Sequence, residues 1–293
     1  MMTSALRVLG MISVIAWLSD RAPAAIVLNY TFDEASFGNA PAGDFGTGVP
    51  AVGAFVGGAT RTSNTPNGFS AGALDLTVAG GGTYLDGGDI DKLDNLTVFT
   101  LTAWINLQGT PSGNLRIMSK QGGGAFPGFS WNFADPITGA GTRTAANFGL
   151  RLFVGGTVGF AFDGTPTGLS IDADNKWAFI AVSYDGSSFS NNVNYYVGSV
   201  DNSATLVSTT TVSAGTVSDN TARFGVGYTD AAPAADTAPP GFLDDIRVYD
   251  GVLQPQEVEL ARLANIPEPS SGSLLLSALV VSAWRRRTQR APV

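Results

Sequence analysis

Hydrophobic and polar residues alternate with a period of two along much of this chain. The clearest run covers residues 97–107, and shorter runs of the same kind recur on both sides of it. Successive side chains of a strand point to opposite faces, so this alternation predicts strands that bury one face or both. The predicted strands are residues 28–32, 97–107, 148–154, 158–162, 176–184, 194–200, 223–228 and 242–249.

Two local signals add a hairpin and a helix. Gly155-Gly156 separates two alternating runs, and a pair of glycines at such a place favours a tight β-hairpin. Residues 254–264 carry a helical pattern, with Pro255 near the first turn. Many short strands followed by one late helix predict an all-β protein, an antiparallel β-sandwich with one short C-terminal helix. We expect residues 26–265 to form a single domain of this kind.

The first 25 residues have the three parts of a secretory signal peptide. Arg7 supplies the positive charge, residues 8–18 are apolar, and Ala22-Pro23-Ala24 has the small-x-small pattern of a cleavage site. A buried core helix is the alternative interpretation. We expect residues 1–25 to direct export.

The other end of the chain is patterned in a different way. Pro267-Glu268-Pro269 precedes an apolar segment, residues 270–284, which is followed by Arg285, Arg286 and Arg287. Arginines after an apolar segment are typical of the cytoplasmic side of a membrane. Residues 270–284 would span about 22 Å as a helix, less than the ~30 Å hydrocarbon core, so a transient insertion is expected.

This C-terminal pattern resembles the PEP-CTERM sorting signals of Gram-negative bacteria. The resemblance rests on Pro267-Glu268-Pro269, the apolar segment and the arginine cluster, in that order. It implies an exported protein with a membrane-inserted precursor, processed by an exosortase-type sorting protease and transferred to the cell surface or extracellular matrix. An ordinary C-terminal anchor is the alternative.

Composition removes several classes of chemistry. The chain contains no cysteine and no histidine, which excludes disulfides, thiolate and imidazole metal sites, and cysteine- or histidine-dependent catalysis. The formal net charge is −8, and the part between the two ends is more acidic because the arginine cluster lies in the tail. Nucleic acid is therefore not an expected partner, whereas a divalent cation is.

Several motifs follow one another in a characteristic order. Leu28-x-Tyr30-x-Phe32-Asp33-Glu34 opens the domain, the strand of residues 176–184 begins with Lys176-Trp177, and Asp244-Asp245-Ile246-Arg247 lies near the end. These motifs resemble the LamG-like jelly roll of the concanavalin A-like lectin/glucanase class, over nearly all of residues 26–265. The chain differs from the family pattern in having Asp244-Asp245 for Asp-Glu. The resemblance implies a jelly-roll fold.

Catalysis by a glucanase of this class needs two carboxylates that flank the scissile bond. The related glucanases carry them as Glu-x-Asp-x-Glu on one strand, and this chain has no such triplet and no glutamate between Glu34 and Glu257. The pairs in Asp89–Asp91 and Asp172–Asp174 could substitute, but both lie in sequence where Asp favours turns. We therefore expect no enzymatic activity.

Calcium is the cofactor that these residues favour, because it binds six to eight oxygen ligands. By family position, Asp33 and Glu34 at the end of the first strand would meet Asp244 and Asp245 on the last, since these strands of a jelly roll commonly lie side by side. Solvated acids that form turns are the alternative interpretation. Residues 86–91 are a second, weaker candidate.

Aromatic residues suggest where a sugar would bind. Trp104 and Trp177 lie in apolar strands and are expected in the core, whereas Trp131 lies in a glycine-rich region and is the candidate ligand-facing ring, with core packing as the alternative. The sequence thus predicts a secreted, surface-sorted, non-catalytic binding module for extracellular polysaccharide, a surface protein or other matrix material. A glycoside-active enzyme and a purely structural matrix protein stay open as alternatives.

Overall fold

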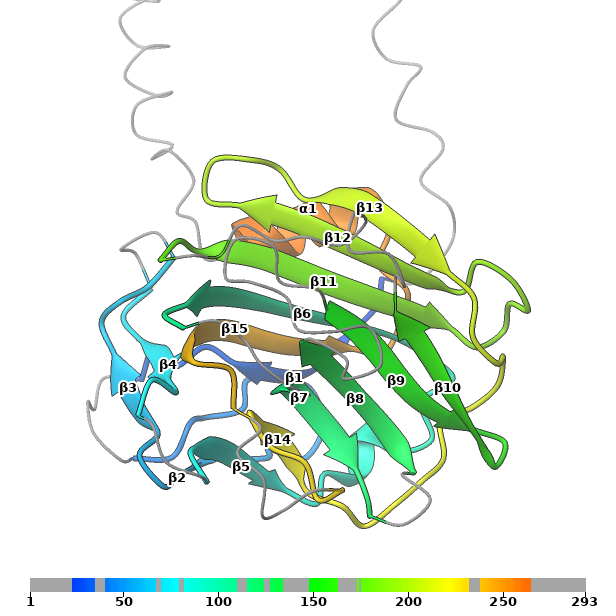
Figure 1. Cartoon of the computed structure of the whole chain (residues 1–293), viewed down its shortest axis with the longest axis horizontal. Coiled ribbons are helices and arrows are strands. Elements are labelled where there is room, and N and C mark those ends of the chain that lie inside the picture. Colours follow the sequence, from blue (N-terminus) through cyan, green and yellow to red (C-terminus); the bar gives the residue numbers. More distant parts are fainter. Residues whose placement is uncertain are drawn as a thin grey trace, which may run out of the picture.

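The computed structural model describes residues 23–34, 40–66, 70–78, 82–109, 115–123, 127–133, 148–162, 173, 175–231 and 238–264. Within these residues two antiparallel sheets pack face to face, with one short α-helix near the end (Figure 1). The predicted all-β sandwich of the jelly-roll type is confirmed. The predicted signal peptide up to residue 22, the predicted sorting tail, Asp172 and Asp174 lie outside the described residues.

The first sheet has eight strands in the order β13-β12-β11-β6-β15-β4-β3, and β1 pairs with β15 beside this path. First and last strands are therefore neighbours, as the jelly-roll resemblance implied. Its strands are β1 (Ile26–Tyr30), β3 (Thr60–Thr62), β4 (Ala73–Asp75), β6 (Val98–Leu107), β11 (Ala178–Asp185), β12 (Val193–Ser199), β13 (Thr205–Thr210) and β15 (Gly241–Tyr249).

The second sheet has seven strands in the order β10-β9-β8-β7-β14-β5-β2. The predicted hairpin at Gly155-Gly156 is confirmed, because β9 and β10 pair with Val154 opposite Thr157. Its strands are β2 (Ala54–Val56), β5 (Tyr84–Gly88), β7 (Leu115–Gln121), β8 (Gly128–Phe133), β9 (Phe148–Val154), β10 (Thr157–Phe162) and β14 (Phe224–Val226). A 3₁₀ turn, η1 (Asp91–Leu93), follows β5.

Large aromatic side chains fill the space between the sheets. Phe99 of β6 contacts Phe129 of β8 with ring centroids 5.5 Å apart, and Phe148 of β9 contacts Tyr195 of β12 at 5.7 Å. Both pairs join one sheet to the other, so the inner faces are the apolar faces that the alternation predicted.

The helix α1 (Pro255–Leu263) covers the outer face of the first sheet. It begins with a capping box between Gln254 and Glu257, and Pro255 takes its first turn as predicted. Its buried Val258 packs in a cluster with Trp104, which is 1% exposed. Among the described residues, no helix has the length and apolar character needed to cross a bilayer.

Candidate functional site

Polar residues form a row across the outer face of the second sheet. The strand pairings place Asp86 of β5 beside Gly225 of β14, Gly225 beside Ser119 of β7, Ser119 beside Ser130 of β8, and Ser130 beside Arg151 of β9. Their sequence neighbours pack in the core between the sheets. Since side chains alternate along a strand, the row lies on the face turned away from the core.

A second row on the same face contains an amide without a partner. Asn132 of β8 pairs with Arg116 of β7 and with Gly149 of β9. Its side chain is fully buried, Oδ1 accepts a hydrogen bond from the Ser130 hydroxyl, and Nδ2 has no hydrogen-bond partner in the part of the chain that the structure describes. A buried N–H group without an acceptor is costly, so a water oxygen would be bound favourably at Asn132.

Two stacked tyrosines lie at one end of this face. The rings of Tyr84 and Tyr228 are 4.2 Å apart at an angle of 21°, and the guanidinium of Arg223 lies 4.9 Å from the centroid of the Tyr228 ring. The Tyr228 ring lies over Gly225, where an added Cβ would stand 2.8 Å from the tyrosine Cβ. Glycine at position 225 therefore allows the ring to lie on the sheet.

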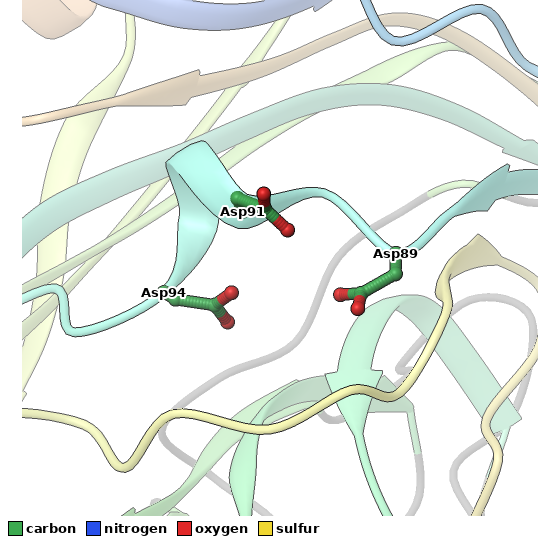
Figure 2. Close-up of side chains that lie close together, drawn as sticks. All are labelled: Asp89, Asp91 and Asp94. Atoms are coloured by element: carbon green, nitrogen blue, oxygen red, sulfur yellow. The ribbon is translucent and has the colours of Figure 1, made fainter.

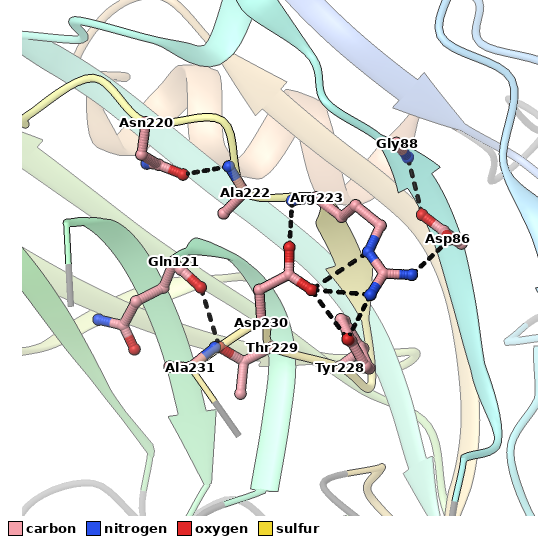
Figure 3. A network of polar contacts seen from close by, with 10 residues as sticks. All are labelled: Asp86, Gly88, Gln121, Asn220, Ala222, Arg223, Tyr228, Thr229, Asp230 and Ala231. Atoms are coloured by element: carbon pink, nitrogen blue, oxygen red, sulfur yellow. Dashed lines mark hydrogen bonds and ion pairs between the residues drawn. The ribbon is translucent and has the colours of Figure 1, made fainter. Parts of the chain in front are cut away.

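Ion pairs hold this aromatic end in place (Figure 3). Arg223 donates to Asp230 through Nε at 3.1 Å and Nη2 at 2.9 Å, and its Nη1 lies 3.3 Å from Asp86. Burial alone would raise the pKa of Asp230, but hydrogen bonds from the Arg223 backbone, Tyr228 and the guanidinium lower it. The Arg223 side chain keeps 41% exposure. Tyr228 itself is 4% exposed, so the fixed donor of Arg223 and its carboxylate partners are the groups here that suit a hydroxyl-rich ligand.

A cluster of three carboxylates lies beyond the end of β5. Asp89, Asp91 and Asp94 have ligand oxygens within 4.8 Å of one another, and Figure 2 shows the three side chains directed toward a common space. The ammonium of Lys120, 1% exposed, lies 2.8 Å from Asp89 and 2.6 Å from Asp94. Burial raises the pKa of Asp94, and the hydrogen bond from Lys120 only partly offsets this. A lysine therefore already neutralises part of the cluster.

A surface hollow of about 620 Å³ adjoins these acids. Its lining includes the apolar Val49, Pro50 and Val52 and the charged Asp89, Asp91 and Lys92. Val49 and Val52 are 83% and 59% exposed. The hollow thus combines apolar and charged lining residues, at the end of the second sheet that lies next to β5.

The family of the chain follows from a comparison with known protein families. Residues 79–259, more than half of the chain, match the model of the concanavalin A-like lectin/glucanases superfamily. The chain belongs to this superfamily. No curated protein sequence matches it. The LamG-like resemblance read from the motifs is therefore confirmed at the level of the domain family.

Solved structures with a similar fold have distant sequences. One is domain 4 of AbnA, a GH43 extracellular arabinanase from Geobacillus stearothermophilus in complex with arabinotriose: the TM-score is 0.53 at 15% identity, over 82% of this chain and 99% of that one. Another is the binding domain of botulinum neurotoxin serotype G, with a TM-score of 0.54 at 13% identity, over 82% and 51%.

A structure of botulinum neurotoxin type C, described as dependent on two ganglioside molecules for cell entry, gives a TM-score of 0.53 at 13% identity, over 82% and 51%. The chain of the present protein thus spans about half the length of the toxin chains that it matches. At these identities the likeness shows the fold alone.

The acids predicted to bind calcium are only partly brought together. The strands β1 and β15 are adjacent. Burial raises the pKa of Asp244 most, and the nearby charges of Asp245 and Asp33 raise it further. Asp33 accepts hydrogen bonds from the Ser70 hydroxyl and from backbone amides. Glu34 turns away and pairs with Arg61 at 2.8 Å.

The last strand is irregular where these acids lie. Asp244 pairs with Trp104, but Arg247 pairs with Thr102, so β15 carries one extra residue, and Asp245 has a φ of 54°. Asp245 and Arg247 form an ion pair at 2.5 Å, both nearly fully buried. Asp244 is 1% exposed, and its Oδ2 accepts no hydrogen bond from the described residues. Asp33 and Asp245 at this bulge have protein partners.

The structure corrects the interpretation of Trp131. Its ring is fully buried and packs edge-on against Phe148 at 5.9 Å, in the core between the sheets. Phe129, Trp131 and Phe133 share the inner face of β8, and the polar residues of that strand face outward. The ligand-facing ring expected at this position is a core residue.

The second candidate for a metal site, residues 86–91, is also made of other residues than expected. Asp89 and Asp91 do approach each other, but Asp91 begins the 3₁₀ turn η1 rather than sharing a strand face with Asp89. Asp86 belongs instead with Arg223 on the outer face. Sequence reasoning missed Asp94 and Lys120. One signal was available for Lys120: it stands two residues after Met118, on the face of β7 that packs in the core.

Proposed function

We propose that this chain is a secreted, non-catalytic binding module that recognises carbohydrate or other extracellular matrix material on the outer face of its second sheet. The observation that carries the proposal is the set of hydroxyl, amide and guanidinium groups in two adjacent rows on that face, with Asn132 Nδ2 lacking an acceptor among the described residues. Sugars are bound by such groups beside aromatic rings. The arabinanase domain solved with arabinotriose has a similar fold, and so does the neurotoxin whose cell entry is described as dependent on two ganglioside molecules.

A binding experiment tests this proposal directly. The purified full chain would be titrated calorimetrically against arabinotriose and a panel of oligosaccharides, alongside Asn132→Leu. We expect that variant to lose binding at least tenfold, and to lose only about 1–3 kcal/mol of stability, because the hydrogen bond from the Ser130 hydroxyl is the one that the change removes. Asn194→Leu, on β12 of the other sheet, is the matched control and should bind as the native chain does. Equal binding by Asn132→Leu would contradict the proposed site.

The arrangement of acids supports a non-catalytic role. Glycosidase carboxylates stand on two sides of the scissile bond, roughly 5–9.5 Å apart. Asp89, Asp91 and Asp94 crowd within 4.8 Å, and Lys120 binds two of them. Release of reducing sugar from any glycan of the panel would favour the enzyme alternative. Retention in the matrix without affinity for any glycan would favour a purely structural protein.

We further propose that the tail sorts the protein to the cell surface or extracellular matrix of a Gram-negative bacterium. The support is the order of Pro267-Glu268-Pro269, the apolar segment and Arg285–Arg287. Replacing the Pro-Glu-Pro motif by alanines should leave a membrane-retained precursor of full length, detected by fractionation and immunoblot. A mutant that reaches the matrix at normal rate and size would contradict processing by an exosortase.

Calcium is proposed as a structural cofactor near Asp33, Asp244 and Asp245. The support is the buried Asp244 Oδ2, which accepts no hydrogen bond from the described residues and stands close to two other carboxylates. Oxygen ligands of this kind suit Ca²⁺, which would offset their mutual repulsion. The melting temperature of the full chain should rise in millimolar calcium and fall with chelator. Asp245→Asn should weaken this response, and Asp89→Asn should not.

A further inference from the structure

The hairpin between β11 and β12 presents an aromatic ring to solvent. Phe189, in the connection of residues 186–192, is 87% exposed, the highest value among the large hydrophobic residues of the described parts of the chain. Exposed single hydrophobic residues are common on proteins. This one differs because the backbone around it is fixed by side-chain hydrogen bonds.

Bonds within the connection hold its shape. Asp185 Oδ1 accepts hydrogen bonds from the backbone amide and the hydroxyl of Ser187. The Ser188 amide donates to the Asp185 carbonyl at 3.1 Å, and the Ser188 hydroxyl donates to the Ser190 carbonyl at 2.8 Å. The residues on both sides of Phe189 are therefore tied to each other.

Further bonds tie the connection to the chain that follows β13. Asn192 is 1% exposed, and its amide donates to the carbonyls of Ser188 and Val212, both at 3.0 Å, while its Oδ1 accepts from the Val212 amide at 2.9 Å. The Asn191 amide donates to the Thr211 hydroxyl at 2.9 Å. A ring on a loop braced in this way loses little conformational freedom on binding, which favours affinity.

The surroundings of the ring are polar, and the nearby carboxylate of Asp185 is held by the backbone amide and hydroxyl of Ser187. Ser187, Ser190, Asn191 and Thr211 are exposed beside it, and the sequence has no charged residue between Gly186 and Val200. A bilayer partner would want basic residues and more than one apolar side chain. Hydroxyls and an amide around one flat ring instead match a ligand with an apolar ring face and a hydroxyl rim.

We propose that Phe189 is a stacking platform for a neutral sugar ring, and that the hairpin of residues 186–192 is a polysaccharide-binding subsite distinct from the outer face of the second sheet. The inference rests on the proposed carbohydrate-binding function and names its ligand class, a neutral polysaccharide. The ring covers the C–H face of the sugar, and Ser190 and Asn191 supply hydrogen bonds to its hydroxyls.

Affinity electrophoresis of the full chain tests the subsite. Native gels would contain dextran or arabinan as neutral probes, polygalacturonate as an anionic one, or chitosan as a cationic one. Phe189→Ala should weaken retardation by a neutral probe at least tenfold, equivalent to about 1.4 kcal/mol. Phe189→Trp should retain it. Phe45→Ala is the matched control, because Phe45 is 63% exposed on another loop, and it should behave as the native chain does.

The outcomes separate the subsite from the proposed function. Native-like retardation of Phe189→Ala, with loss in Asn132→Leu, would overturn the subsite and leave the function standing. Binding that depends on Phe189 but occurs only with charged probes, or only with phosphatidylcholine vesicles, would also overturn it. A native chain that no polysaccharide retards would overturn both. Melting temperatures within about 2 °C of the native value would show that the Phe189 variants fold.

Discussion

Replacing Lys120 by methionine tests whether an internal ammonium holds the end of the second sheet together. Lys120 extends from β7, is 1% exposed, and binds Asp89, Asp94 and the carbonyl of Asn220 at 2.6–2.8 Å. Methionine keeps most of the side-chain volume, so the change removes the charge and three hydrogen bonds with little cavity. The loss then reports on the ion pairs rather than on packing.

The expected magnitude follows from the exposure of the partners. Removing one member of a buried ion pair costs about 3–5 kcal/mol when the other charge stays buried. Here the Asp89 side chain is 40% exposed and that of Asp94 12%, so water can solvate one acid but hardly the other. We expect a loss near the lower limit, about 3 kcal/mol. For a domain of this size that is roughly 6–12 °C in melting temperature.

Lys92→Met is the matched control. Lys92 pairs with Asp44, but Asp44 also accepts hydrogen bonds from the backbone amides of Asn29, Gly46 and Ala51. Because those donors remain, the control should lose only about 1 kcal/mol. Thermal unfolding followed by circular dichroism would compare the two variants with the native chain.

A calcium titration of the Lys120→Met protein sharpens the test. Without the ammonium, three carboxylates stand within 4.8 Å with no cation between them, and a divalent ion should restore part of the lost stability. Adding Asp89→Asn should restore part of it without calcium. A melting temperature within 1 °C of the native value would refute the reasoning, and so would a loss that neither calcium nor Asp89→Asn reduces.

Two further predictions concern titration. Burial and the charges of Asp245 and Asp33 raise the pKa of Asp244 well above its usual range, so the folded state keeps a proton that the unfolded state loses near pH 4. The stability of the fold should therefore decline as pH rises above that value. Asp244→Asn, measured in chelator, should raise the melting temperature at pH 7 but not at pH 4. Arg262 lowers the pKa of Glu259 to about 2, so this pair should stabilise the fold above about pH 4 and lose that effect toward pH 2. Glu259→Gln should cost about 1 kcal/mol at pH 7 and nothing at pH 2, and an equal difference at both values would contradict the ion pair.

The architecture could be predicted because its main signals are local. Period-two alternation identified β6, β11 and β15 to within two residues, and the glycine pair identified the β9–β10 hairpin. Pro255 marked the first turn of α1. Each of these features depends on residues adjacent in sequence, where the spacing of apolar side chains directly reflects the geometry of the element.

The site could not be predicted as well because its contacts are distant in sequence. Glu34 next to Asp33 suggested half of a metal site, and only the fold shows that Glu34 forms an ion pair with Arg61 instead. The glycine-rich surroundings of Trp131 suggested an exposed ring, although Phe129 and Phe133, each two residues away from it, already favoured an inward face. Arg223 and Asp86 lie far apart in the chain and meet only through the β5–β14 pairing.

The net charge of the chain is a poor guide to its ligand for the same reason. An acidic composition suggested cation binding, yet Asp44 and Asp94 are both held by lysines of the protein itself. Carboxylates engaged in this way organise loops and have little capacity left for a partner. The buried amide of Asn132 and the exposed ring of Phe189 are uncharged. Recognition through these groups would depend little on salt, so affinity for a neutral polysaccharide that persists at 1 M NaCl is the behaviour that separates this mode of binding from an electrostatic one.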